Sequence, residues 1–197
     1  MAEPLNAAAL DQLFRTARTF NGYQDRPVST EQLEAIWELM KFGPTSANCL
    51  PARIIWCTSD AAKERLAACA MPANGEKIVK APVTAIIGMD MAFYEHLPEL
   101  FPHTDARSWF VGNDVLIEKT AFRNSSLQGA YFIMAARALG LDTGPMSGFN
   151  NDAVDAAFFA DQPSVKSNFI STLGYGDPAT IFERSPRPGF GRFNRIV

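Results

Sequence analysis

With 197 residues, 47% of them hydrophobic, the chain is long enough to bury one sizeable core, so we expect a single domain over residues 1–197. The formal net charge of -3 argues against a nucleic-acid-binding surface, which is normally strongly basic. The longest nearly apolar run, residues 127–139, is shorter than the roughly 20 residues of a membrane-spanning helix. Three cysteines and a start without a basic flank and apolar core indicate reduced thiols, no signal peptide and a cytoplasmic location.

The first predicted elements are two helices. One is expected over residues 7–17. The second is better defined, because Ser29 and Gln32 form a capping-box pattern ahead of an apolar face at helical spacing over residues 33–40. Gly43 and the proline after it end this helix.

The rest of the chain alternates between apolar strands and further helices. Strands are predicted at 53–58, 81–90 and 167–177, with helices at 60–70 and 118–139. The last helix is apolar on almost every side towards its end, which is typical of a helix surrounded by protein. The tail from Pro178 has only weak strand or helix signals. This order of helices around a few strands predicts an α+β domain.

Common catalytic motifs are missing from the sequence. His96 and His103 do not have metal-site spacing and no cysteine pair is closely spaced, so no metal site is expected. A serine elbow, a Walker phosphate loop and a dinucleotide fingerprint are also absent. An enzyme with so little acid–base equipment can take its chemistry from an organic cofactor.

Five stretches carry a stronger signal through their order: "RTFNGY" (18–23), "PTSANCLP" (44–51), "NGEKIVKAPV" (74–83), "GLDTGPMSGF" (140–149) and "SPRPGF" (185–190). Together they resemble the flavin-dependent nitroreductase family. The resemblance implies a nitroreductase-like α+β fold with a central, mostly antiparallel sheet flanked by helices. It also implies FMN in a groove between the subunits of an intertwined homodimer.

Within this family, one branch is particularly similar. The stretches "MKFGPTSANC", "FPHTDARSWF", "TAFRNSSLQ" and "ALGLDTGPMSGF" resemble the malonic semialdehyde reductases of the Rut pyrimidine-degradation pathway, which make 3-hydroxypropionate. This resemblance implies a small aldehyde as substrate and NADH or NADPH as the hydride donor.

The resemblance assigns the phosphate of FMN to the two ends of the chain. Arg18, Thr19 and Arg187 match phosphate-binding positions, and the planar fork of a guanidinium suits a phosphate. Arg184 is close enough to Arg187 to be confused with it. Asn21 stands where the family usually has a basic residue, and it should reach the ribityl or pyrimidine side of the flavin. For each arginine, the alternative is a solvated surface charge.

The flavin ring is assigned to two further stretches. Asn74 and Lys77 match the pair over the pyrimidine, where a lysine would stabilise negative charge in the reduced flavin. The stretch beside the flavin edge, with a backbone N–H aimed at N5, comprises Pro145, Met146, Ser147 and Gly148. The alternatives are an exposed turn at Asn74 and a helix stop with a glycine turn after residue 139.

The polar loop after the second helix matches the segment that reaches the flavin from the partner subunit. Pro44, Ser46 and Asn48 are its expected contacts, and Leu50 replaces a glutamine that is frequent in the family. Cys49 is interpreted as a small packing residue, because nothing in the sequence lowers the pKa of its thiol.

The substrate side of the site is assigned to "FPHTDARSWF". We expect Arg107 to bind the substrate carboxylate and His103 or a water to donate the proton, with Arg123 as the second candidate for the carboxylate. The alternatives are a surface histidine and a structural pair of Arg107 with Asp105. Two other functions stay open: a broad-specificity nitro-compound or quinone reductase, and a flavin-binding protein without fast turnover.

Overall fold

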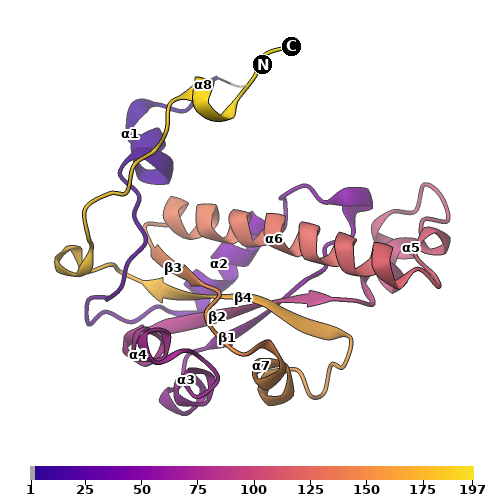
Figure 1. Cartoon of the computed structure of the whole chain (residues 1–197), viewed down its shortest axis with the longest axis horizontal. Helices are drawn as coiled ribbons and strands as arrows, with labels where there is room; N and C mark the ends of the chain where they lie inside the picture. Colours follow the sequence, from indigo (N-terminus) through magenta and orange to yellow (C-terminus); the bar gives the residue numbers. More distant parts are fainter. Residues whose placement is uncertain (1–2) are drawn as a thin grey trace.

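The computed structural model describes residues 3–197 and has a four-stranded sheet between two layers of helices (Figure 1). The strands lie in the order β1-β2-β4-β3, and each neighbouring pair is antiparallel. Their bounds are β1 (Ala52–Cys57), β2 (Val83–Asp90), β3 (Asp142–Met146) and β4 (Val165–Gly174). The predicted α+β class and antiparallel sheet are therefore confirmed.

Helices cover both faces of the sheet. One face carries α2 (Thr30–Met40) and α6 (Asp114–Ala138), and the other carries α3 (Asp60–Ala67), α4 (Pro72–Lys80) and α7 (Asn151–Phe158) (Figure 1). The shorter helices are α1 (Ala7–Leu10), α5 (Leu97–Leu100), α8 (Phe190–Phe193), a π-helix at Asp11–Arg15 and 3-10 turns at Ser46–Asn48, Phe93–His96, Arg107–Trp109 and Pro178–Thr180. No helix within residues 3–197 is both long enough and apolar enough to cross a membrane.

Strand β2 separates the two main cores, because side chains alternate between the faces of a strand. Val83, Ala85 and Ile87 pack with the buried residues of α2 and α6. Ile86 packs on the opposite face with the buried residues of α3, α4 and α7. All eight residues of β2 are buried, as expected for an inner strand covered on both faces.

The predicted elements largely agree with the longer observed ones, but α4, α7 and β3 were not predicted and one predicted helix is divided. The helix expected at 7–17 consists of α1 followed by the π-helix. The stretch at Asn74, for which an exposed turn was the alternative, lies in α4, where Gly75 is buried and a Cβ atom on it would lie 3.2 Å from the Ala67 carbonyl oxygen of α3. The stretch containing Pro145 is strand β3, which tolerates proline because it lies at the edge of the sheet. Helix α7 was not predicted.

Candidate functional site

A cavity of about 510 Å³ lies where the N-terminal segment meets the C-terminal tail. It brings together four residues predicted from opposite ends of the sequence, namely Arg18, Thr19, Asn21 and Arg187. Arg184 lines it as well, so both arginines that the sequence could not separate face the same space. The remaining charged residues of the lining are Arg137 and Glu183, which leaves the cavity with an excess of positive charge.

The arginines of this cavity donate to backbone carbonyls and not to carboxylates. Arg18 donates to the carbonyl oxygen of Phe182. Arg184 donates to those of Arg15 and Ala17 at 3.0 and 2.9 Å, and Arg187 to that of Ser185 at 3.0 Å. No salt bridge involves these three arginines within residues 3–197. Their charges are thus held in place but not neutralised, which suits the binding of an anion.

Arg137 is a cavity residue that was not predicted from the sequence. It lies in the last turn of α6, donates to the carbonyl oxygen of Leu13 at 2.9 Å, and its Nε is buried without a hydrogen-bond partner in the described structure. Burial lowers the pKa of its guanidinium. The signal in the sequence was a charged residue inside the apolar run of residues 127–139.

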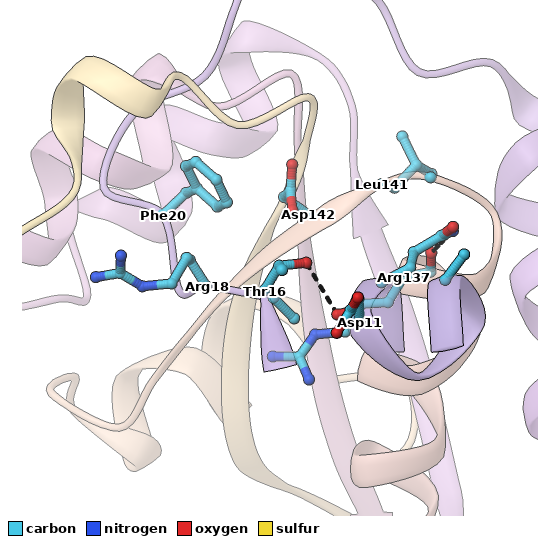
Figure 2. Close-up of a pocket in the computed structure, with 11 residues that line it drawn as sticks. Asp11, Thr16, Arg18, Phe20, Arg137, Leu141 and Asp142 are labelled. Atoms are coloured by element: carbon cyan, nitrogen blue, oxygen red, sulfur yellow. Dashed lines mark hydrogen bonds between the residues drawn. The ribbon is translucent and has the colours of Figure 1, made fainter. Parts of the chain in front are cut away.

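Arg137 also lines a second cavity of about 460 Å³, which shares Arg18 with the first (Figure 2). In Figure 2, the side chain of Arg18 points away from Asp11 and Thr16. Asp142 lies in this second cavity, and partial burial raises the pKa of its carboxyl group. The second cavity balances two arginines against Asp11 and Asp142, whereas the first sets four arginines against Glu183 alone, so the first is the better anion site.

Strand β3 connects the arginine-lined cavity to the stretch assigned to the flavin edge. Thr19 forms an isolated parallel bridge with Thr143, and the Phe20 amide donates to the Thr143 carbonyl at 3.3 Å. Ser147 and Gly148 follow directly after the end of β3. At about 3.3 Å per residue, Ser147 lies roughly 13 Å along the chain from Thr143. The strand therefore sets the spacing between the two stretches.

The two ring-assigned stretches meet at the far end of β3. The Asn74 side chain donates to the Gly148 carbonyl at 3.0 Å, and the Met71 amide donates to the same oxygen at 3.0 Å. A Cβ atom on Gly148 would lie 2.6 Å from the Asn74 amide nitrogen, so only glycine permits this approach. Lys77 is half-buried on α4, one turn after Asn74, and has no ion pair or side-chain hydrogen bond in the described part of the chain.

The polar loop with Pro44, Ser46 and Asn48 does not join these residues within one chain. It follows α2 on the face of the sheet covered by α6, whereas α4 lies on the other face (Figure 1). The Ser46 amide donates to the Asn124 side chain on α6 at 2.8 Å. The contacts of this loop with the flavin of a partner subunit stay a prediction.

The segment assigned to the substrate has a different arrangement from the one expected. Arg107 forms two hydrogen bonds with Glu95, at 2.7 and 2.8 Å, and not the pair with Asp105 that the sequence left open. His103 is exposed, with its ring 5.2 Å from that of Phe101. Within residues 3–197, no group of three or more histidine, cysteine or acidic residues has the arrangement of a metal site.

Cys49 is buried in the core beside α5 and α6. Burial raises the pKa of its thiol to about 11, so the thiol is neutral at physiological pH. This environment supports a packing role, as the sequence indicated.

Comparison with known proteins gives the family directly. The model of the nitroreductase family matches residues 14–175, and the chain belongs to this family. A protein of Polynucleobacter asymbioticus, provisionally named NADH dehydrogenase/NAD(P)H nitroreductase, is 59% identical over 197 residues and covers 100% of both chains. A protein of Burkholderia lata with the same kind of provisional name is 62% identical over 192 residues, covering 98% of each chain.

A solved structure supports the same fold. The crystal structure of a provisionally named nitroreductase from Exiguobacterium sibiricum, in complex with FMN, superimposes with a TM-score of 0.86 at 19% identity and covers 100% of both chains. The nitroreductase-like fold predicted from the sequence is therefore confirmed.

Proposed function

We propose that this protein is an FMN-dependent oxidoreductase that takes hydride from NADH or NADPH. The observation that carries the proposal is the cavity lined by Arg18, Arg137, Arg184 and Arg187, joined through β3 to Lys77 and Gly148. The FMN complex of the structural relative and the NAD(P)H-linked names of the sequence relatives support it.

The residues present fit FMN in charge and in shape. The arginines around Thr19 can take the phosphate, because their guanidinium groups are not neutralised by carboxylates. At the other end of β3, Gly148 leaves the backbone open to a planar ring, and Asn74 fixes its peptide. The unpaired ammonium of Lys77 lies one helical turn from Asn74.

Each group then has a chemical task. When bound, FMN supplies hydride transfer between the pyridine nucleotide and the substrate. Lys77 stabilises the negative charge that develops on reduction, because a fixed cation in a partly dry site is more effective than one in water. Pro145, Met146 and Ser147 shape the ring edge, and the arginines orient the cofactor through its phosphate.

A homodimer completes this site in our proposal. Large apolar side chains stay exposed along α6, among them Phe122, Leu127 and Tyr131, and the tail after Ile181 is exposed throughout. An apolar helix face of this kind normally packs on another protein surface. A second copy would cover it and would bring the loop with Ser46 and Asn48 to the flavin of its neighbour.

For the substrate we propose a small carboxylated aldehyde, with malonic semialdehyde, reduced to 3-hydroxypropionate in pyrimidine degradation, as the specific case. Arg107 would have to leave Glu95 in order to bind a carboxylate. Arg123 has no ion pair or side-chain hydrogen bond in the described residues, and with Lys119 it borders an apolar hollow of about 440 Å³. We therefore favour Arg123 for the substrate carboxylate and keep His103 as the candidate proton donor.

A broad-specificity nitro-compound or quinone reductase is the second candidate. The names of the sequence relatives favour it. An open flavin face needs few substrate-specific groups, so the same site could serve both chemistries.

Purified protein tests the proposal in two steps. We expect a yellow solution that releases FMN on denaturation and oxidises NADH or NADPH without oxygen when an acceptor is supplied. A colourless protein that does not take up added FMN would disprove the cofactor, and bound FMN without turnover would leave a flavin-binding protein.

Rates with malonic semialdehyde, propanal and a nitroaromatic compound then distinguish a reductase of small carboxylated aldehydes from a broad-specificity nitro-compound or quinone reductase. Arg123→Ala should raise the KM for malonic semialdehyde and leave that for propanal unchanged, whereas Arg107→Ala serves as the matched comparison. Equal losses with both aldehydes would contradict a carboxylate role for either arginine.

A further inference from the structure

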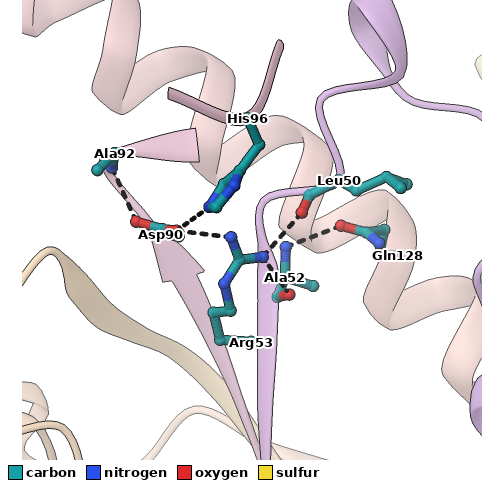
Figure 3. A network of polar contacts seen from close by, with 7 residues as sticks. All are labelled: Leu50, Ala52, Arg53, Asp90, Ala92, His96 and Gln128. Atoms are coloured by element: carbon teal, nitrogen blue, oxygen red, sulfur yellow. Dashed lines mark hydrogen bonds and ion pairs between the residues drawn. The ribbon is translucent and has the colours of Figure 1, made fainter. Parts of the chain in front are cut away.

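Helix α6 contains two fully buried amide side chains one turn apart, Asn124 and Gln128. Residues four apart lie on one face of a helix, and this face meets the polar loop that follows α2. The Asn124 Oδ1 accepts the Ser46 amide at 2.8 Å, and the Gln128 Oε1 accepts the Ala52 amide at 2.8 Å. Figure 3 shows the second contact, at the point where the loop enters β1.

The segment between these two contacts has an unusual backbone. Ala47, Asn48 and Leu50 have φ angles of 49°, 50° and 37°, in the left-handed region that side chains other than glycine's disfavour. Such conformations persist only where the surrounding structure holds them. The loop sequence alone would not maintain this path.

Local contacts support the middle of the loop but do not tie its ends to the helix. The Leu50 amide donates to the Thr45 hydroxyl at 3.3 Å, and Arg53 donates to the Leu50 carbonyl at 3.0 Å while it pairs with Asp90 at 2.6 Å (Figure 3). His96 faces the same carboxylate at 3.9 Å. Two contacts from elsewhere in the fold also hold the loop: the Asp90 amide donates to the Pro51 carbonyl at 2.8 Å, and the Asn48 side chain donates to the Leu100 carbonyl at 2.9 Å. The two amides of α6 are the side chains of this helix that accept from the loop backbone, one at its beginning and one at its end.

The burial of Gln128 has an energetic cost. Its Nε2 is buried and has no hydrogen-bond partner in the described structure. An unpaired buried donor is unfavourable, and leucine at the same place would avoid it. The acceptor atom of Gln128 therefore explains why an amide is buried at this position. Asn124 is better satisfied, since its Nδ2 donates to the Thr120 carbonyl at 2.8 Å.

We infer that Asn124 and Gln128 are positioning residues that hold Ser46–Ala52 in its left-handed path, so that Ser46 and Asn48 are presented to the flavin of the second subunit. The inference rests on the proposed function for the flavin contact. The anchoring itself is independent of it and can be measured separately.

Hydrogen exchange of the full-length protein tests the anchoring without any cofactor. Asn124→Leu and Gln128→Leu should each accelerate exchange over residues 44–52 by about tenfold or more, since each removes an acceptor of a loop amide. Ser125→Ala is the matched control, because Ser125 is equally buried on α6 and does not contact the loop. Loop exchange that is unchanged in both leucine variants, or accelerated as much in the control, would overturn the inference.

The functional consequence is measured as the dissociation constant of FMN. We expect each leucine variant to weaken the binding of FMN by about tenfold, and Asn124→Asp, which keeps the acceptor, to recover most of the affinity. Adding Leu50→Gly to Gln128→Leu should also recover affinity, since glycine adopts the left-handed conformation readily.

The two proposals can fail separately. If wild-type protein binds no FMN, the proposed function fails while the exchange result still decides the anchoring. If FMN binds the leucine variants as tightly as wild type although their loops exchange faster, the positioning role is overturned and the flavoenzyme proposal stands. Should a leucine variant not fold, the Asn124→Asp and Gln128→Glu variants replace it, with retained loop protection expected and lost protection contradicting the inference.

Discussion

The Asn74 side chain donates a 3.0 Å hydrogen bond to the Gly148 carbonyl and joins the start of α4 to the segment that follows β3. Because the Met71 amide donates to the same oxygen, this peptide is held from two directions. The contact fixes which way the backbone after β3 faces, and in our proposal this backbone forms the flavin edge.

Replacement of Asn74 by alanine removes this contact. We expect the free energy of unfolding to fall by about 1 kcal/mol, the usual value of a partly buried side-chain hydrogen bond, and FMN to bind more weakly. Urea denaturation and flavin titration measure the two effects. An affinity for FMN equal to that of wild type would show that the contact does not orient the flavin edge.

The charge of the arginine-lined cavity should control FMN affinity. Arg18→Ala is expected to raise the dissociation constant of FMN by about tenfold or more, because a charge-assisted contact to phosphate is lost. Glu183→Gln removes the acidic residue of the same lining and should lower the dissociation constant of FMN.

Fluorescence titration at several salt concentrations measures both changes. Arg192→Ala, on the exposed tail and outside the cavity, is the control and should have no effect. A phosphate site here would be contradicted if Arg18→Ala tightened FMN binding and Glu183→Gln weakened it. Equal effects of Arg18→Ala and Arg192→Ala on FMN affinity would contradict it as well.

The charge of Lys77 should affect flavin reduction more than flavin binding. Lys77→Gln is expected to slow reduction by NADH or NADPH on the order of 100-fold, the typical loss when one stabilising group is removed, and to lower the flavin reduction potential. Lys80→Gln is the matched control, since Lys80 is on the same helix but pairs with Glu76 at 3.7 Å. Stopped-flow absorbance gives the rates. Equal rates in the two variants would exclude Lys77 from this role.

The three thiols should differ in reactivity in the native protein. Burial raises the pKa of Cys49 and of Cys57 to about 11, above their ordinary value, so at pH 8 both are protonated and poorly reactive. Cys69 is only partly buried. We expect iodoacetamide to modify Cys69 first, as judged by peptide mass spectrometry, and Cys69→Ser to remove the fast reaction. Rapid native labelling of Cys49 would contradict its packing role.

Sequence reasoning located most of the sheet and the long helix, because their hydrophobic patterns reflect burial directly. It missed α4 and β3 for a common reason. Gly75 and Pro145 are unfavourable for a helix and a strand in isolation, but close packing against α3 and an edge position in the sheet make them acceptable. The local propensity of a residue carries no information about packing against a neighbouring helix or about its position in a sheet.

The sequence by itself determined the fold class and, through the order of five short stretches, the family to which the chain belongs. Only the tertiary structure decided that Arg18, Arg184 and Arg187 face one cavity, that Arg137 joins them, and that Glu95 and not Asp105 pairs with Arg107. Side chains far apart along a chain meet only after packing fixes the distances between their elements, and no local pattern records those distances.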